Sequence, residues 1–224
     1  MPGAPCLPTT EARTNIQKPL LRSIFPDMAA RFPNPASCLL DERSPLDFRT
    51  VFGGMLSEST STEIAIRNIR LGAVDLSSQE LNQLRRLRIL VAEVNAHTVE
   101  SEAYAMSADP SKQENLQRIL NLFREGRLEI RSAPLGGWSP DFTVFSNQHG
   151  PNCLLLGLHW FHRPFPHRGP AWAINLGSEE AEMASKRFTE IWENAHDIGP
   201  AVRRLMERTA QRGTFRNSGL TIHQ

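Results

Sequence analysis

The sequence predicts an α/β protein built on a mixed β-sheet with helices on both faces. Short β-rich runs, such as residues 62–69 (TEIAIRNI), are separated by amphipathic helical segments in the first half of the chain. Residues 88–94 (RILVAEV) form a nearly continuous apolar run, which is typical of a central strand buried on both faces. Three short apolar strands and a long helix then follow between residues 127 and 198.

Size and composition are those of one soluble domain. The 224 residues carry a net charge of +1, so binding to nucleic acid or to a membrane would need a local charged patch. The three cysteines, Cys6, Cys38 and Cys153, form no C-x-x-C pair, which argues against a zinc site and a disulfide framework and fits a cytoplasmic protein. No apolar run could cross a bilayer and no signal peptide is recognisable, and we expect no cofactor.

The first third of the chain contains an arm and the beginning of the domain. Residues 1–40, rich in Pro, Thr and small side chains, predict a mobile N-terminal arm, and residues 41–212 predict a single domain. Ser44 and Pro45 predict the start of a helix, followed by apolar residues at helical spacing. These apolar residues are Leu46, Phe48, Val51, Phe52, Met55 and Leu56.

Helices are predicted on both sides of the central strand. A helix preceded by Ser77 and Ser78 would place Leu81, Leu84 and Leu87 on one face. After the strand, residues 96–106 predict a short helix, and a second helix would be capped by Ser111 and ended by Gly126.

The last part of the domain contains three predicted strands and two predicted helices. The strands are residues 127–134 (RLEIRSAP), 140–147 (PDFTVFSN) and 153–160 (CLLLGLHW). An amphipathic helix begins at Ser178, a final helix covers residues 200 to about 211, and residues 213–224 predict a frayed tail.

Four of these segments resemble the second half of a phospholipase D-like domain. They read LFREGRLEIRSAP, SPDFTVF, LLLGLHWF and RFTEIWENA, between residues 115 and 195, and residues 46–94 resemble the first half less specifically. The resemblance implies a phospholipase D-like αβα sandwich. In that superfamily a strand carries H-x-K, with His as the nucleophile and Lys as the phosphate ligand, and a later strand ends in G-S-x-N.

This chain departs from that catalytic pattern. Ser139 stands in the position of the His, and Asp141 stands in the position of the Lys. Gly157 matches the Gly of G-S-x-N, but Leu158 and Trp160 replace the Ser and the Asn. A carboxylate in place of a cation would repel a phosphate, so the resemblance predicts a degenerate member without the usual chemistry.

Other residues between 141 and 168 offer a substitute set. Asp141, His159 and His162 are the candidate catalytic residues if the protein is an enzyme, and Arg163, His167 and Arg168 are candidate phosphate ligands. Three alternatives stay open for this Arg/His/Pro segment: a rigid connection packed on the core, a phosphate or nucleic-acid contact, and a metal site. Asp141 can equally be a structural partner of Arg131 or His159.

The final predicted helix carries a second candidate site. Arg203, Arg204, Arg208 and Arg212 are spaced so that three can align on one face and follow a nucleic-acid backbone, although Glu207 interrupts the row.

Three hypotheses of function follow. The first is a non-catalytic phospholipase D-like accessory protein that binds DNA or partner proteins, such as helicase or nuclease subunits, in DNA modification or antiviral defence. The second is a phosphodiesterase or nuclease with a rearranged His/Asp site, which would act as a homodimer because the chain has room for one copy of the site. The third is an unrelated α/β scaffold.

Overall fold

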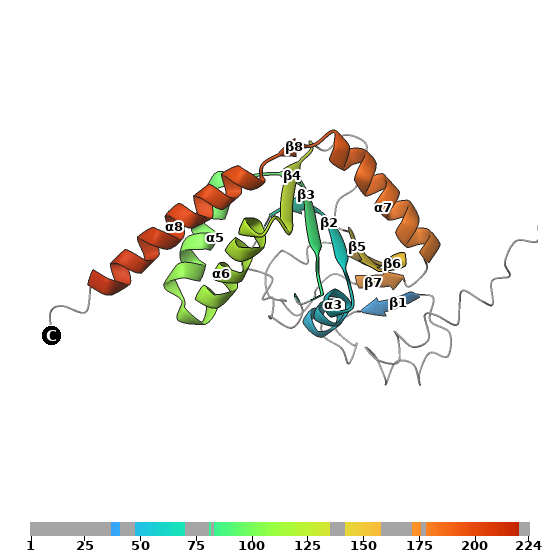
Figure 1. The fold of residues 1–224 in the computed structure, drawn as a ribbon, viewed down its shortest axis with the longest axis horizontal. Coiled ribbons are helices and arrows are strands. Elements are labelled where there is room, and N and C mark those ends of the chain that lie inside the picture. The colour runs from blue at the N-terminus through green and yellow to red at the C-terminus, as the bar shows by residue number, and fades with distance from the viewer. Residues whose placement is uncertain are drawn as a thin grey trace, which may run out of the picture.

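The computed structural model describes residues 37–40, 48–69, 81, 83–134, 142–157, 172–175 and 178–219. Within them lie eight strands in one sheet, ordered β1-β7-β6-β5-β2-β3-β4-β8 (Figure 1). The strands are β1 (Ser37–Leu40), β2 (Ser61–Asn68), β3 (Arg86–Glu93), β4 (Leu128–Ser132), β5 (Phe142–Asn147), β6 (Gly150–Gly157), β7 (Trp172–Asn175) and β8 (His196–Asp197). The helices are α3 (Phe48–Ser57), α5 (Ala96–Ala108), α6 (Pro110–Arg124), α7 (Ser178–Glu193) and α8 (Gly199–Gly219).

The sheet is mixed, as the sequence predicts. Strands β2, β3 and β4 are parallel neighbours, and all other neighbouring pairs are antiparallel. Helices connect the parallel strands β3 and β4, whereas a tight turn connects the antiparallel strands β5 and β6.

The two faces of the sheet carry different layers. Alternate residues of a strand point to opposite faces, so Ile64 and Ile89 enter the large core, while Ala65 and Leu90 enter a smaller one. The large core also contains buried residues of α3, α5, α6 and α8, and the smaller core contains Phe188 and Trp192 of α7. In Figure 1, α7 and the group of α5, α6 and α8 accordingly lie on different sides of the sheet. The predicted α/β class with helices on both faces is confirmed.

The five predicted strands are confirmed in the described residues as β2 to β6. Alternation predicted β2, and the apolar run predicted β3, in which Leu90 and Val91 are fully buried. Gly126 follows α6 with a φ of 69°, a left-handed conformation that favours glycine and ends the helix as expected. Cys153 is buried and free, as its place in an apolar run predicts.

Two local predictions are wrong. Leu87 lies in β3 and Leu84 precedes it outside any helix, so a helix through Leu81, Leu84 and Leu87 is excluded, although all three are buried. Their spacing is compatible with burial in a helix or in an extended segment. Leu87 is in a strand because it pairs with Leu128 of β4. Ser111 is not a cap, because α6 begins at Pro110, whose fixed φ suits the first helical position.

Three short strands were not predicted. Strand β1, at the end of the predicted arm, pairs with β7, and β8 adds two residues to the edge of β4. Helix α8 continues to Gly219, past the predicted end near residue 211. Ser44, Pro45 and Leu46 lie outside the described residues. Among the helices described, none has the length and hydrophobicity needed to cross a bilayer.

Candidate functional site

The structure describes only part of the predicted site residues. Asp141, His159, His162, Arg163, His167 and Arg168 all lie outside the described residues, as does Ser139. Arg203, Arg204 and Arg208 lie on α8 with described side chains. Residue 212 belongs to the same helix, but its side chain lies outside the description.

The described strands that border the two predicted catalytic segments are neighbours. Strand β5 begins at Phe142, directly after Asp141 in the chain, and β6 ends at Gly157, directly before Leu158. Phe142 pairs with Leu156 of β6 on one side and with Ala65 of β2 on the other. The start of β5 and the end of β6 therefore lie side by side at one end of these two interior strands.

The arginines of α8 differ in their partners. Arg203 donates to Glu207 at 3.1 Å, and Glu207 also pairs with Arg124 of α6 at 3.5 Å. Arg204 and Arg208 are exposed, and neither forms an ion pair with another described residue. The glutamate that interrupts the row is thus occupied by two guanidinium groups, and it leaves Arg204 and Arg208 available to an external anion.

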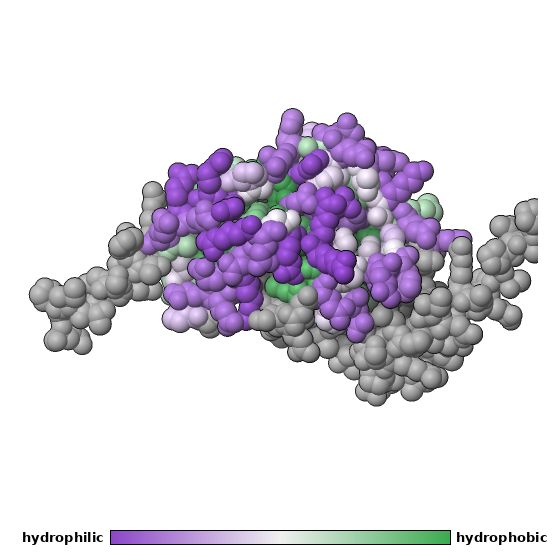
Figure 2. Space-filling model, in the orientation of Figure 1, coloured by the Kyte–Doolittle hydropathy of each residue, from purple (hydrophilic) through white to green (hydrophobic). Residues whose placement is uncertain are grey.

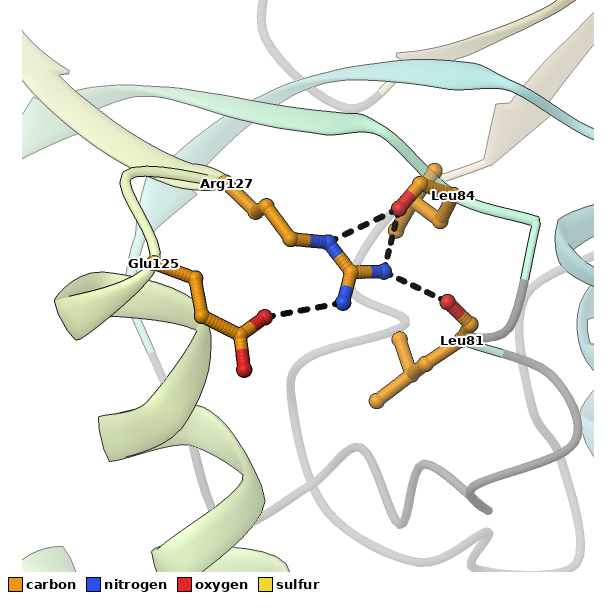
Figure 3. A network of polar contacts seen from close by, with 4 residues as sticks. All are labelled: Leu81, Leu84, Glu125 and Arg127. Carbon is orange, nitrogen blue, oxygen red and sulfur yellow. Dashed lines mark hydrogen bonds and ion pairs between the residues drawn. The ribbon is translucent and has the colours of Figure 1, made fainter.

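Other arginines are committed to the fold. Arg127 points back from the start of β4 toward the entry of β3, as Figure 3 shows. It donates from Nε to the Leu84 carbonyl at 2.9 Å and from Nη2 to the Leu81 carbonyl at 2.6 Å, and it pairs with Glu125 at 2.9 Å. Most N–H groups of this guanidinium are therefore used to join two loops, and Arg127 is a structural residue.

The helices on the two faces have opposite charge. Helix α8 contains five arginines and one glutamate in its sequence, a formal charge of +4. Helix α7 contains five glutamates, one lysine and one arginine, a formal charge of −3. Because the whole chain has a net charge of only +1, its charge is segregated between two helices.

A buried ion pair lies beneath α7. The guanidinium of Arg88 on β3 donates to the Glu63 carboxylate on β2, and Glu63 is only 3% exposed. The carbon centre of the Arg88 guanidinium lies 5.4 Å from the ring centroid of Phe188 and 5.5 Å from that of Trp192. Desolvation raises the pKa of Glu63 above its ordinary value, while Arg88 and the Ser185 hydroxyl oppose the rise.

This pair leaves two atoms without a partner. Glu63 Oε2 and Arg88 Nε are buried and make no hydrogen bond to a described residue. A perturbed carboxylate can indicate catalysis, but the cavity described below does not include Glu63. The cation–π contacts instead indicate an anchor for α7.

A groove lies beside β4. It has a volume of about 340 Å³ and is lined by residues of α6, β4, β8 and α8. Arg203 and Arg204 line it together with Arg131, a residue that sequence analysis weighed only as a partner of Asp141. On the side of the molecule shown in Figure 2, the described surface is mostly hydrophilic, and hydrophobic side chains are visible mainly in its middle.

The described residues contain no group of three or more His, Cys, Asp and Glu side chains that could hold a metal ion. The predicted His-rich segment is not covered by this statement, because it lies outside the described residues. Cys153 contacts Met55, with 3.5 Å between the sulfur atoms, and burial raises the pKa of its thiol. Cys153 is therefore a packing residue rather than a nucleophile.

Comparison with known proteins gives distant structural similarity. No protein-family model and no curated protein matches the sequence. TrmBL2, described as an archaeal chromatin protein with a novel mode of DNA binding, is 15% identical with a TM-score of 0.45, over 83% of this chain and 63% of its own. Nuc, a phospholipase D family member from Salmonella typhimurium, is 12% identical with a TM-score of 0.41, over 72% of this chain and 97% of its own.

A third similar structure is phosphatidylserine synthase from Haemophilus influenzae Rd KW20. It is 10% identical with a TM-score of 0.45, over 80% of this chain and 45% of its own. The chain therefore spans less than two thirds of the length of two of these proteins. Similarity at this level carries no conclusion about function, which has to be argued from the residues themselves.

Proposed function

We propose that this protein binds nucleic acid, and DNA in particular, through the arginine face of α8, as a non-catalytic accessory protein of phospholipase D-like architecture. The observation that carries the proposal is the charge segregation between the two helices. Helix α8 carries +4 with exposed Arg204 and Arg208 free of described ion pairs, whereas α7 carries −3. A polyanion would be attracted to one side of the molecule and repelled from the other.

The spacing of the arginines suits a linear polyanion. Arg204 and Arg208 are one helical turn apart, and the Nε of Arg208 lies 3.4 Å from the Arg204 carbonyl, so both side chains follow one face of α8. Residue 212 continues this row by one more turn. Arginines along a helix can contact successive backbone phosphates without reading bases, which predicts weak sequence preference and strong salt dependence.

The test is a binding titration of duplex DNA at low salt, followed by fluorescence anisotropy. The double variant Arg204→Gln/Arg208→Gln should weaken binding strongly and lower the slope of log K against log salt by about 2, because two phosphate contacts are lost. The matched control is Lys186→Gln/Arg187→Gln, which removes two cations from α7. Equal weakening by both double variants, or no DNA binding by the unmodified protein at low salt, would refute the proposal.

The accessory role extends the proposal to partners. Ser139, Asp141 and Leu158 replace the residues of the usual catalytic set, so the protein would contribute binding while helicase or nuclease subunits supply the reaction, in DNA modification or antiviral defence. A tagged protein should co-purify with an ATPase or nuclease. Excess untagged variant that cannot bind DNA should displace the tagged protein from that complex.

A second candidate function is a phosphodiesterase with a rearranged site. The pairing of Phe142 with Leu156 favours it, because it joins the described strand ends next to Asp141 and Leu158. Asp141, His159 and His162 would act on the phosphodiester, with Arg163, His167 and Arg168 as phosphate ligands, in a homodimer. Turnover of a generic phosphodiester, measured with and without divalent metal, should disappear in His159→Ala. Absence of turnover in every condition would remove this candidate.

A further inference from the structure

The groove beside β4 combines charged side chains from three parts of the chain. Arg131 comes from β4, Asp197 from β8, and Arg203, Arg204 and Glu207 from α8. Its volume of about 340 Å³ is within the range of small-ligand sites, and its lining includes three arginines and three acidic residues.

Each carboxylate of the groove already has a partner. Glu129 pairs with Arg86 at 2.6 Å, and Asp197 accepts from the backbone N–H of Gly199 at 2.9 Å. Glu207 is shared by Arg203 and Arg124. Glu129 is therefore compensated by an arginine outside the groove and Asp197 by a backbone N–H at the start of α8, whereas Glu207 is shared between Arg203 of the groove and Arg124 outside it. None of these three carboxylates pairs with Arg131 or Arg204.

Two guanidinium groups keep N–H donors that bond to no residue in the described part of the chain. Arg204 forms no ion pair with a described residue. Arg131 donates from Nη1 to the Trp192 carbonyl at 2.8 Å and stacks on the Trp192 ring, with 4.8 Å from its carbon centre to the centroid. That contact fixes the guanidinium plane, while its remaining N–H groups make no hydrogen bond within the described part of the chain.

We infer that this groove binds one phosphate group, with Arg131 and Arg204 as its principal ligands and Arg203 beside them. The lining contains three arginines and three acidic residues, but Glu129 and Glu207 also pair with Arg86 and Arg124 from outside the groove, and neither Arg131 nor Arg204 pairs with a described carboxylate. Planar guanidinium groups such as these can bind the oxygens of a phosphate in pairs.

The natural source of the phosphate is either a nucleic-acid backbone or a small phosphorylated molecule. The first source rests on the proposed nucleic-acid function, since Arg204 also belongs to the row that continues along α8 to Arg208. A nucleic-acid strand bound along α8 would place one of its phosphates in the groove. That phosphate would fix the register of the nucleic acid on the helix.

The test uses inorganic phosphate, titrated into the full chain and followed by NMR of the arginine Nε–H groups. Arg204→Gln and Arg131→Gln should each weaken phosphate binding by roughly tenfold, because each removes a charged hydrogen-bond donor. Lys186→Gln on α7, outside the groove, should leave it unchanged. Equal losses in all three variants, or no binding of phosphate, would overturn the inference.

A variant that binds phosphate more tightly cannot be explained by misfolding, which would only weaken binding. Glu207→Gln frees Arg203 and Arg124 from their shared carboxylate, and it should tighten phosphate binding about two- to fivefold. The matched control is Glu114→Gln on α6, which removes the same charge from an exposed pair with Arg118. Equal tightening of phosphate binding in both variants would show a general effect of charge, and it would overturn the inference that the groove binds phosphate.

Competition separates the two sources of phosphate. If a short DNA duplex displaces phosphate from the groove, the backbone is the source. If phosphate binds while DNA does not, the phosphate site in the groove is supported with a small phosphorylated molecule as its ligand, and the proposed nucleic-acid function is refuted. If DNA binding depends on Arg208 while the groove variants leave phosphate binding unchanged, the phosphate site is refuted and the nucleic-acid function is supported.

Discussion

Helices α7 and α8 follow one another in the chain and cover opposite faces of the same sheet, but they are attached differently. Beneath α7 lies the buried Glu63–Arg88 pair, with the guanidinium packed against the rings of Phe188 and Trp192. Helix α8 is attached by apolar side chains, among them Val202 and Met206, which join the large core. An ion pair positions a helix through specific geometry, whereas an apolar stripe requires only burial.

The outer surfaces of the two helices differ as well. Helix α7 presents glutamates and α8 presents arginines, so the two sides of the sheet attract different ligands. The buried charges of this protein thus serve the fold, while the exposed charges of α8 are available for binding.

The largest effect is expected at the buried pair. Arg88→Ala leaves the Glu63 carboxylate buried without its partner, and it should lower the free energy of unfolding by about 3–5 kcal/mol in urea denaturation. The double variant Glu63→Leu/Arg88→Met should recover most of that loss, because it removes both charges and keeps the volume. A loss below about 1 kcal/mol for Arg88→Ala would show that α7 does not depend on the pair.

The apolar attachment of α8 should be almost as sensitive. Met206 is fully buried, and Met206→Ala should cost about 2–5 kcal/mol by removing contacts and leaving a cavity. The matched control is Met183→Ala on α7, where the side chain is 73% exposed, and its effect on thermal unfolding should be negligible. Similar losses for the two variants would contradict the assignment of Met206 to the core.

The pH dependence of stability should separate the two attachments. Because burial raises the pKa of Glu63, the folded state binds a proton more readily than the unfolded state. The contribution of Glu63 to stability is therefore fully present below its ordinary pKa of 4.5 and is lost as pH rises through the raised value. In urea denaturation across this pH range, the stability of the protein should fall as pH rises, whereas Glu63→Gln should lack this slope because its side chain does not titrate. Parallel pH profiles of the two proteins would contradict the prediction.

The smallest effect concerns the start of α8. Asp197 accepts a hydrogen bond from the Gly199 N–H at 2.9 Å and places a negative charge at the helix N-terminus. Asp197→Ala should cost about 1 kcal/mol, measured by urea denaturation. Asp197→Asn keeps the accepting oxygen and should cost less, so an equal loss in both variants would mean that the charge, and not the hydrogen bond, matters.

Much of the fold follows from local patterns. The alternation of residues 62–69 and the apolar run of residues 88–94 predict β2 and β3 because periodicity follows from which face is buried. The same logic fails where a pattern fits two elements, as for Leu84 and Leu87, and where strands are too short to show a pattern, as for β1, β7 and β8. Those strands exist because a neighbouring strand edge supplies their hydrogen bonds.

The candidate site was predictable only in part. The arginine row of α8 is visible in the sequence, but Arg124 and Arg131 are not, because they join it from α6 and β4. The six predicted residues between 141 and 168 remain predictions, since they lie outside the described residues. No local pattern could have paired Arg88 with Glu63, because their pairing depends on β2 and β3 being neighbours.

The α/β class, the principal strands and the opposite charges of the last two helices follow from the sequence alone, since burial periodicity and charge are properties of short segments. Which arginines hold the fold together, and which face solvent without a carboxylate, depends on how the elements pack. Arg88 is held beneath α7 and Arg127 by the carbonyls of Leu81 and Leu84, while Arg204 has no described ion pair. The physical reason is that the partner of a long charged side chain is set by strand order and helix packing, which bring distant segments together.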